Sequence, residues 1–193
     1  MGTQGLFIHG AGQGAHAADE KLVANLRQAL GPEYAIHYPA MPHEDDADYP
    51  LWKVRIASEL TAMQDPVLLL GHSVGASMLL KYLSEIEVER TIAGIFLLAT
   101  PFWGGDGWRY EGFARLALQE GFAAKLPAGA PIFMYHSRDD EIVPFAHLEL
   151  YARSLPQATI RALDGRRHQL NDDLSEVAED IRGPHRKRRS SHP

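Results

Sequence analysis

The sequence contains no cysteine and no long apolar run, and both absences exclude classes of function. Without cysteine the chain cannot form disulfides, thiolate metal sites or a cysteine nucleophile. No apolar segment approaches the roughly 20 residues that a membrane-spanning helix needs. The start of the chain, residues 1–5, has no basic region, so we expect no signal peptide. Together these absences predict a cytoplasmic protein without a membrane partner.

Basic residues are scarce outside the C-terminus. The net charge is −6, although five of the 19 Lys and Arg residues lie within residues 182–193, a stretch without acidic residues. The rest of the chain is therefore strongly acidic, which repels phosphate backbones and argues against a nucleic-acid ligand. Residues 183–193 lack the apolar side chains that could offset the entropy lost on ordering. We expect them to form a dispensable basic tail.

Short apolar runs alternate with amphipathic segments over most of the chain. Residues 6–8, 67–70, 95–98 and 132–135 are apolar at consecutive positions, as is typical of parallel strands covered on both faces. Weaker strands are expected at 34–38 and 158–162. Helical spacing of apolar residues predicts helices within 22–29, 52–63, 78–83 and 174–181. This alternation predicts one α/β domain, residues 1–182, with a doubly wound, mostly parallel sheet of about six strands.

One glycine-flanked serine has the setting of a catalytic nucleophile. Residues 71–75 read Gly-His-Ser-Val-Gly; they follow the run 67–70 and precede the amphipathic segment at 78–83. Strand, tight turn and helix in this order form a nucleophile elbow. The turn strains the serine backbone, and Gly71 and Gly75 let strand and helix approach each other. Ser73 is therefore the predicted nucleophile.

A carboxylate and a histidine follow Ser73 in a suitable order. A serine hydroxyl needs a base to remove its proton, and a carboxylate holds that base. Acidic residues 139–141 lie just past the strand expected at 132–136, and His168 lies just past the strand expected at 158–162. Because the carboxyl ends of parallel strands meet at one edge of a sheet, these groups should converge on Ser73.

Two further motifs resemble those of the α/β-hydrolase superfamily. Residues 140–144, Asp-Glu-Ile-Val-Pro, resemble its Asp-x-x-Val-Pro, which implies that Asp140 is the triad acid rather than a neighbouring carboxylate. His168 stands at the place of the late catalytic histidine. Residues 8–12, Ile-His-Gly-Ala-Gly, resemble its His-Gly-x segment, which implies that the backbone N–H groups of Ala11 and Val74 form the oxyanion hole.

A phosphate-binding loop is the alternative for the glycines at 10–14. The segment lacks the Lys-Ser/Thr ending of a P-loop, and its glycine spacing does not match the dinucleotide-binding motif. The oxyanion assignment therefore fits these residues better. Glycines at 10 and 12 let the main chain approach a substrate oxygen closely.

The resemblance covers residues 6–181 and begins at what would be the third strand of the standard hydrolase. Within the superfamily the chain is most similar to the compact serine hydrolases that include the retinoblastoma-binding hydrolase and its bacterial YdeN relatives. This implies an enzyme that cleaves ester-type acyl bonds of small or medium substrates through an acyl-enzyme, with no metal or organic cofactor. Two alternatives stay open: an amidase or peptidase with the same triad, and a catalytically silent scaffold that binds a protein partner.

Residues 101–127 interrupt the alternation of strands and helices. They are rich in glycine and aromatic residues and longer than a simple crossover needs, so we expect a small cap over the site. Packing of these aromatics onto the sheet is the alternative. The predicted substrate pocket combines residues of the cap with residues of the two glycine motifs: His9, Gly10, His72, Phe102, Trp103 and Trp108.

Overall fold

The sheet consists of six strands, each of which the sequence predicted. The computed structural model describes residues 2–105, 108 and 115–189, and for residues 184–189 the backbone alone. The strands are β1 (Thr3–Ile8), β2 (Tyr34–His37), β3 (Val67–His72), β4 (Ile92–Leu98), β5 (Ile132–Ser137) and β6 (Thr159–Leu163). They lie in the order β2-β1-β3-β4-β5-β6, and every neighbouring pair is parallel. The predicted α/β class and doubly wound sheet are confirmed.

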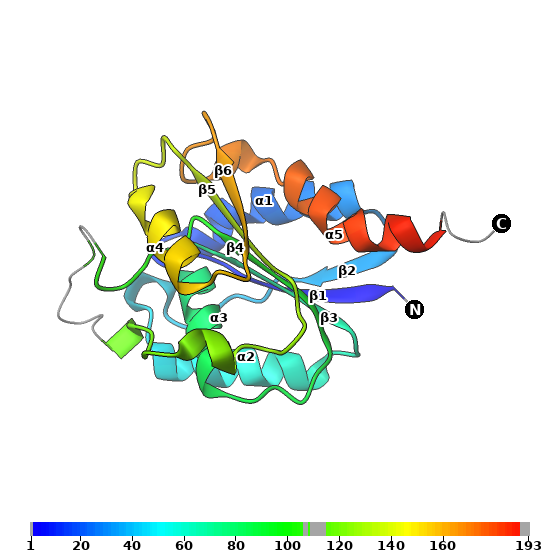
Figure 1. The fold of residues 1–193 in the computed structure, drawn as a ribbon, viewed down its shortest axis with the longest axis horizontal. Coiled ribbons are helices and arrows are strands. Elements are labelled where there is room, and N and C mark those ends of the chain that lie inside the picture. Colours follow the sequence, from blue (N-terminus) through cyan, green and yellow to red (C-terminus); the bar gives the residue numbers. More distant parts are fainter. Residues whose placement is uncertain (1, 106–107, 109–114, 190–193) are drawn as a thin grey trace.

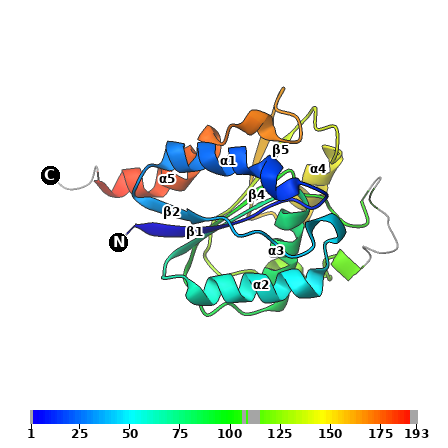
Figure 2. The ribbon, with the colours of Figure 1, turned by 180° about the vertical axis from the view of Figure 1, so that it is seen from behind.

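Helices cover both faces of the sheet (Figures 1 and 2). One layer contains α1 (Ala15–Leu30) and α5 (Ser175–Arg189). The opposite layer contains α2 (Tyr49–Ala62), α3 (Ser73–Glu85) and α4 (Ala146–Ser154). Helix α4 was not expected from the sequence, although Leu148 and Tyr151 on its inner side are buried in the core beside α2 and α3.

Alternate residues of the central strands belong to opposite cores. On β1, Leu6 and Ile8 pack in the core shared with α2, α3 and α4, whereas Phe7 packs in the core shared with α1 and α5. All three side chains are fully buried. Because successive side chains of a strand point to opposite faces, a strand covered by helices on both sides must be apolar throughout. This requirement explains the consecutive apolar runs in the sequence.

The direction of the chain changes between β1 and β3. From β1 the chain passes through α1 to β2 on one side, and then returns through α2 to β3 on the other side of β1. Open α/β sheets bind ligands at such a switch point, outside the carboxyl ends of the strands. The segments that follow β1, β3, β5 and β6 therefore share one edge of the sheet.

The end of α5 lies beyond the predicted domain boundary at residue 182. The helix continues to Arg189, so its backbone extends into the segment expected to be a basic tail, while residues 190–193 lie outside the described residues. Whether the tail is dispensable stays a prediction. No helix among the described residues has the length and apolar character needed to cross a membrane. Of the predicted cap, residues 106–107 and 109–114 also lie outside the described residues.

Candidate active site

The turn between β3 and α3 has the geometry of a nucleophile elbow. Ser73 has a φ of 51°, in the left-handed region that non-glycine residues rarely adopt. A Cβ at Gly75 would lie 2.0 Å from the carbonyl oxygen of His9, and a Cβ at Gly71 would lie 2.6 Å from the Cα of Ala76. Both positions must therefore be glycine, and the strained serine stands at the start of a helix.

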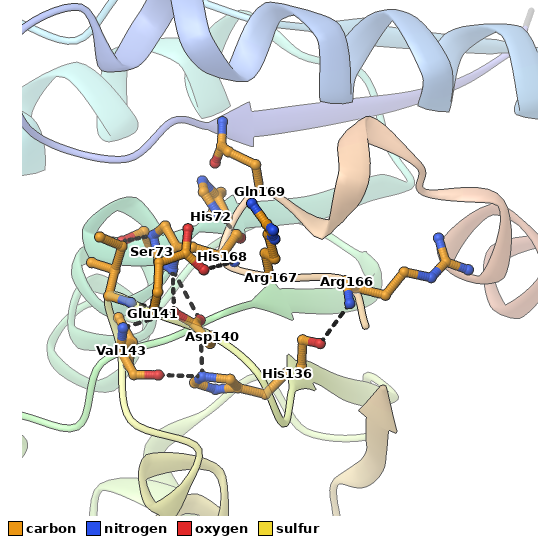
Figure 3. Close-up of polar contacts among 12 residues, drawn as sticks. His72, Ser73, His136, Asp140, Glu141, Val143, Arg166, Arg167, His168 and Gln169 are labelled. Atoms are coloured by element: carbon orange, nitrogen blue, oxygen red, sulfur yellow. Dashed lines mark hydrogen bonds and ion pairs between the residues drawn. The ribbon is translucent and has the colours of Figure 1, made fainter. Parts of the chain in front are cut away.

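Ser73, His168 and Asp140 form a continuous hydrogen-bonded line (Figure 3). The Nε2 atom of His168 lies 3.1 Å from the Oγ of Ser73, and its Nδ1 lies 2.9 Å and 3.0 Å from the two oxygens of Asp140. Because the carboxylate can only accept, Nδ1 carries the proton and Nε2 is free to accept from the serine hydroxyl. The structure thus brings the three predicted residues together, from segments that follow β3, β5 and β6.

The carboxylate of Asp140 is fully enclosed and held from several sides. The backbone N–H groups of Ile142 and Val143 donate to its Oδ1 at 2.9 Å and 2.8 Å. The Nε2–H of His136 is shared between Oδ2 of Asp140, at 3.1 Å, and the carbonyl oxygen of Val143, at 2.9 Å. Burial alone would raise the pKa of Asp140, but the hydrogen bonds from His136 and His168 outweigh it and hold the pKa well below its usual range. Asp140 is therefore ionised at neutral pH.

His168 is held through its backbone as well as its ring. Its N–H donates to Oε2 of Glu141 at 3.1 Å, and its carbonyl lies 3.1 Å from Nε2 of His72. Burial lowers the pKa of the His168 imidazole below its ordinary value of 6.5, and the contact with Asp140 only partly opposes that effect. The ring is therefore neutral at pH 7, which is the form that can accept a proton.

The loop after β1 presents the N–H of Ala11, one of the two predicted oxyanion donors. The N–H of Gly10 donates to Oδ2 of Asp19 at 2.8 Å, and the N–H of Gly12 donates to the carbonyl of Glu44 at 2.6 Å. Both neighbours of Ala11 are thus anchored, whereas none of the described residues accepts a hydrogen bond from Ala11 itself. A fixed loop with a free donor is what an oxyanion hole requires.

The second predicted oxyanion donor is the N–H of Val74. Val74 is the second residue of α3, and the first N–H groups of a helix have no intrahelical acceptor. The N-terminus of a helix also stabilises negative charge. Ala11 and Val74 line the same cavity as Ser73. Their role in holding an oxyanion stays a prediction.

A cavity of about 410 Å³ opens above Ser73. Of the six predicted pocket residues, Gly10, His72 and Trp108 line it. The other three lie outside its lining and pack in the protein interior or against it: His9, Phe102 and Trp103. Trp103, for example, is 6 % exposed and donates its Nε1–H to Ser77 on α3.

A larger depression of about 800 Å³ lies at the opposite end of α3. Residues 83–88, 90–92 and 125–129 line it. Because α3 begins at Ser73 and has 13 residues, the two hollows are separated by roughly 18 Å along the helix. The larger hollow is therefore remote from Ser73, His168 and Asp140.

Sequence reasoning missed several polar residues that hold the site. Asp19 and Gln169 hydrogen-bond to each other beside the loop after β1, Glu44 anchors that loop, and His136 supports Asp140. Polar residues on a helix or beside a strand are usually solvated, and no motif in the sequence sets these four apart.

Comparison with known families agrees with this geometry. The profile of the serine hydrolase family matches residues 24–173, a range that contains Ser73, Asp140 and His168. The chain belongs to the serine hydrolase family. It is thus an enzyme of the α/β-hydrolase fold, as the motifs in the sequence predicted. No curated protein sequence is significantly similar to it.

Similar solved structures share the fold at low sequence identity. Est1E from Butyrivibrio proteoclasticus aligns with a TM-score of 0.71 at 16% identity, over 98% of this chain and 89% of that one. The ydeN gene product from B. subtilis aligns with a TM-score of 0.70 at 18% identity, over 95% and 99%. The esterase domain of a Rhodothermus marinus protein aligns with a TM-score of 0.67 at 19% identity, over 96% and 87%. The YdeN-like fold expected from the sequence is confirmed.

Of the adjacent acidic residues 139–141, Asp140 is the one whose substitution should slow catalysis most. Asp140→Asn should lower kcat by about 10³- to 10⁴-fold, because an amide cannot hold the His168 tautomer that accepts from Ser73. Asp139 accepts hydrogen bonds from Ser137 and from backbone N–H groups of 166 and 167. Since an amide oxygen also accepts, Asp139→Asn is the matched control and should stay within about threefold of the parent. A larger loss in Asp139→Asn than in Asp140→Asn would contradict the assignment.

The lowered pKa of His168 predicts activity at mildly acidic pH. A general base works only when neutral, so kcat/KM should fall on the acid side with a midpoint below 6.5, the ordinary histidine value. The measurement is the pH profile of ester hydrolysis, corrected for spontaneous hydrolysis. A midpoint above 7 would show that His168 is not the base or is not buried.

Proposed function

We infer that the protein hydrolyses ester bonds of small or medium acyl substrates, with Ser73 as nucleophile, His168 as base and Asp140 as the carboxylate that orients it. The observation that carries this proposal is the hydrogen-bonded line from Asp140 through His168 to Ser73, which ends at a cavity. A serine within hydrogen-bond distance of a neutral imidazole, itself oriented by a buried carboxylate, is an activated nucleophile.

Acylation is the first step of the proposed reaction. Ser73 Oγ attacks the substrate carbonyl carbon as its proton moves to Nε2 of His168, and the carbonyl oxygen becomes an oxyanion. The N–H groups of Ala11 and Val74 donate to that oxyanion. Asp140 stabilises the imidazolium that forms, and His168 then protonates the leaving alcohol as the ester bond breaks. The product that remains is an acyl ester on Ser73.

Deacylation uses the same groups in reverse order. Water enters the place left by the alcohol and loses a proton to His168 as it attacks the acyl carbon. The second tetrahedral intermediate is held by the same two N–H groups. It collapses when His168 returns the proton to Ser73 Oγ, which releases the carboxylic acid. Every proton in the cycle moves between substrate, water and residues of this chain, so the proposal calls for no metal or organic cofactor.

The cavity supports small or medium acyl groups rather than long lipid chains. Its volume of about 410 Å³ is near the lower end of the range for ligand pockets, roughly 300–1,000 Å³. Trp108 and Ile142 supply apolar lining, whereas Glu141 on the same wall is polar. The names of two similar structures, Est1E and the esterase domain, favour esters over amides. A cytoplasmic location is also part of this proposal.

Ser73 is the residue that a serine-reactive probe should label. We expect a fluorophosphonate to form one adduct on the parent protein and none on Ser73→Ala, because the Ser73 hydroxyl lies 3.1 Å from Nε2 of a neutral imidazole and stands at the N-terminus of α3. Intact-protein mass spectrometry followed by peptide mapping locates the adduct. Labelling of another serine, or no labelling of folded parent protein, would refute the proposal.

The acyl-length preference should depend on Trp108. With p-nitrophenyl esters, kcat/KM should rise over short acyl chains, since each buried CH₂ contributes about 0.8 kcal/mol, and then fall well before palmitate as the cavity fills. Trp108→Ala should shift the optimum to longer chains. Val54→Ala, a control on an exposed position of α2, should not.

A steady rise of kcat/KM with acyl length up to palmitate in the parent would show an open groove instead of a small cavity. Aminoacyl amides in the same panel test the amidase alternative. Higher kcat/KM on amides than on esters would replace the proposed substrate class.

A further inference from the structure

A second buried acid–histidine pair lies directly beside the proposed triad. Asp19, in the second turn of α1, is 2 % exposed. Its Oδ2 accepts from the N–H of Gly10 at 2.8 Å and contacts Nδ1 of His72 at 2.9 Å. Its Oδ1 accepts from the amide of Gln169 at 2.9 Å. One carboxylate thus joins the oxyanion loop, the residue before the nucleophile and the residue after the base.

The surroundings of His72 require a charged ring. His72 is 2 % exposed, and its two ring nitrogens face Asp19 and the carbonyl oxygen of His168. A carbonyl can only accept, and a carboxylate that already accepts two other hydrogen bonds is an acceptor too. Both nitrogens must therefore donate, which only the imidazolium can do.

The electrostatics agree with that geometry. Burial alone would lower the pKa of His72, but the charge and hydrogen bond of Asp19 outweigh it, so the pKa of His72 is raised. Burial alone would raise the pKa of Asp19, yet the contact with His72 lowers it to about 2. Breaking a buried pair of this kind leaves an uncompensated charge inside the protein, so both members must be kept or replaced together.

We propose that Asp19 and His72 are positioning residues of the hydrolytic site, whose buried ion pair holds the oxyanion loop at Gly10 and the backbone of His168 in register with Ser73. The inference rests on the proposed function of Ser73. Without the pair, the N–H of Gly10 and the carbonyl of His168 would each lose a buried partner. A shift of about 1 Å in either segment is enough to cost roughly 10²-fold in rate.

The pair of Asp19 and His72 also affects the pKa of His168. The ring of His72 lies 4.9 Å from that of His168, centroid to centroid. A charged His72 at this distance disfavours protonation of His168. The carboxylates of Asp140 and Glu141, which contact the ring and the backbone N–H of His168, favour its protonation. Loss of the imidazolium should therefore raise the pKa of His168 and move the acid limb of the rate profile to higher pH.

Asp19→Asn is the variant that tests positioning. The amide accepts fewer hydrogen bonds than the carboxylate and cannot keep His72 charged. We expect kcat and the rate of fluorophosphonate labelling to fall by about 10- to 100-fold, with KM within about threefold of the parent. The acid midpoint of kcat/KM should move up by about half a pH unit or more. A residue with only a structural role would lower the melting temperature without moving that midpoint.

Two further variants separate charge from folding. Asp180→Asn makes the same chemical change on α5, where the carboxylate accepts from Tyr135 and Arg161, and should leave kcat and the acid midpoint unchanged. The double variant Asp19→Asn/His72→Gln removes both charges while keeping amide donors and acceptors. It should recover part of the lost kcat but retain the shifted acid midpoint.

Nitrogen-15 NMR of the histidine rings gives a readout that does not depend on activity. In the full-length parent, both ring nitrogens of His72, assigned by comparison with His72→Gln, should carry protons at pH 7. A neutral His72, or an Asp19→Asn variant with the parent's kcat and acid midpoint, would overturn the inference while Ser73 still reacts in the parent. No reaction at Ser73 in the parent would instead overturn the proposed function, and the positioning role with it.

Discussion

The close approach of α3 to the end of β1 constrains the whole site. A Cβ at Gly75 would collide with the carbonyl of His9, so the helix can start here only because that side chain is absent. The approach places the first N–H groups of α3 beside the loop after β1. It also leaves Ser73 at a positive φ, with Oγ directed to Nε2 of His168. The loop after β1, Ser73 and His168 are therefore placed relative to one tight backbone contact.

Two acid–histidine pairs flank this contact. The charge of each histidine ring depends on the group that faces its second nitrogen, the one that does not contact the carboxylate. In the pair of Asp140 and His168, the second nitrogen faces the hydroxyl of Ser73, which can donate, so the ring stays neutral. In the pair of Asp19 and His72, the second nitrogen faces a carbonyl, which cannot donate, so the ring is a cation. The same two residue types thus form a neutral ring that can accept a proton in one place and a charged ring that can only donate in the other.

The four central strands were predictable because a parallel strand covered on both faces has to be apolar at nearly every position. The edge strands β2 and β6 gave weaker signals, since they carry exposed polar residues such as His37 and Arg161. Four of the five helices were predictable because their apolar residues recur at helical spacing, although α3 is buried on all sides from Ser73 to Ser84. Helix α4 was missed because it has only nine residues and one of its three buried residues, His147, is polar, which leaves only Leu148 and Tyr151 as an apolar stripe. A stripe over two turns is too short to distinguish a helix from a loop.

The sequence by itself was enough to locate site residues whose position follows from a local turn or from the end of a strand. Ser73 was predictable because its turn needs glycines at fixed spacing, and the carboxylates at 139–141 and His168 because they follow strands that must end at the same edge. The choice of Asp140 among these carboxylates came from the resemblance to the Asp-x-x-Val-Pro motif. Only the tertiary structure decided the roles of Asp19 and His136, since each acts through a contact with a residue on another element. The tertiary structure also buries His9 and Trp103 outside the lining of the cavity. Local patterns specify backbone conformation, whereas the partner of a buried polar group depends on which elements fold against it.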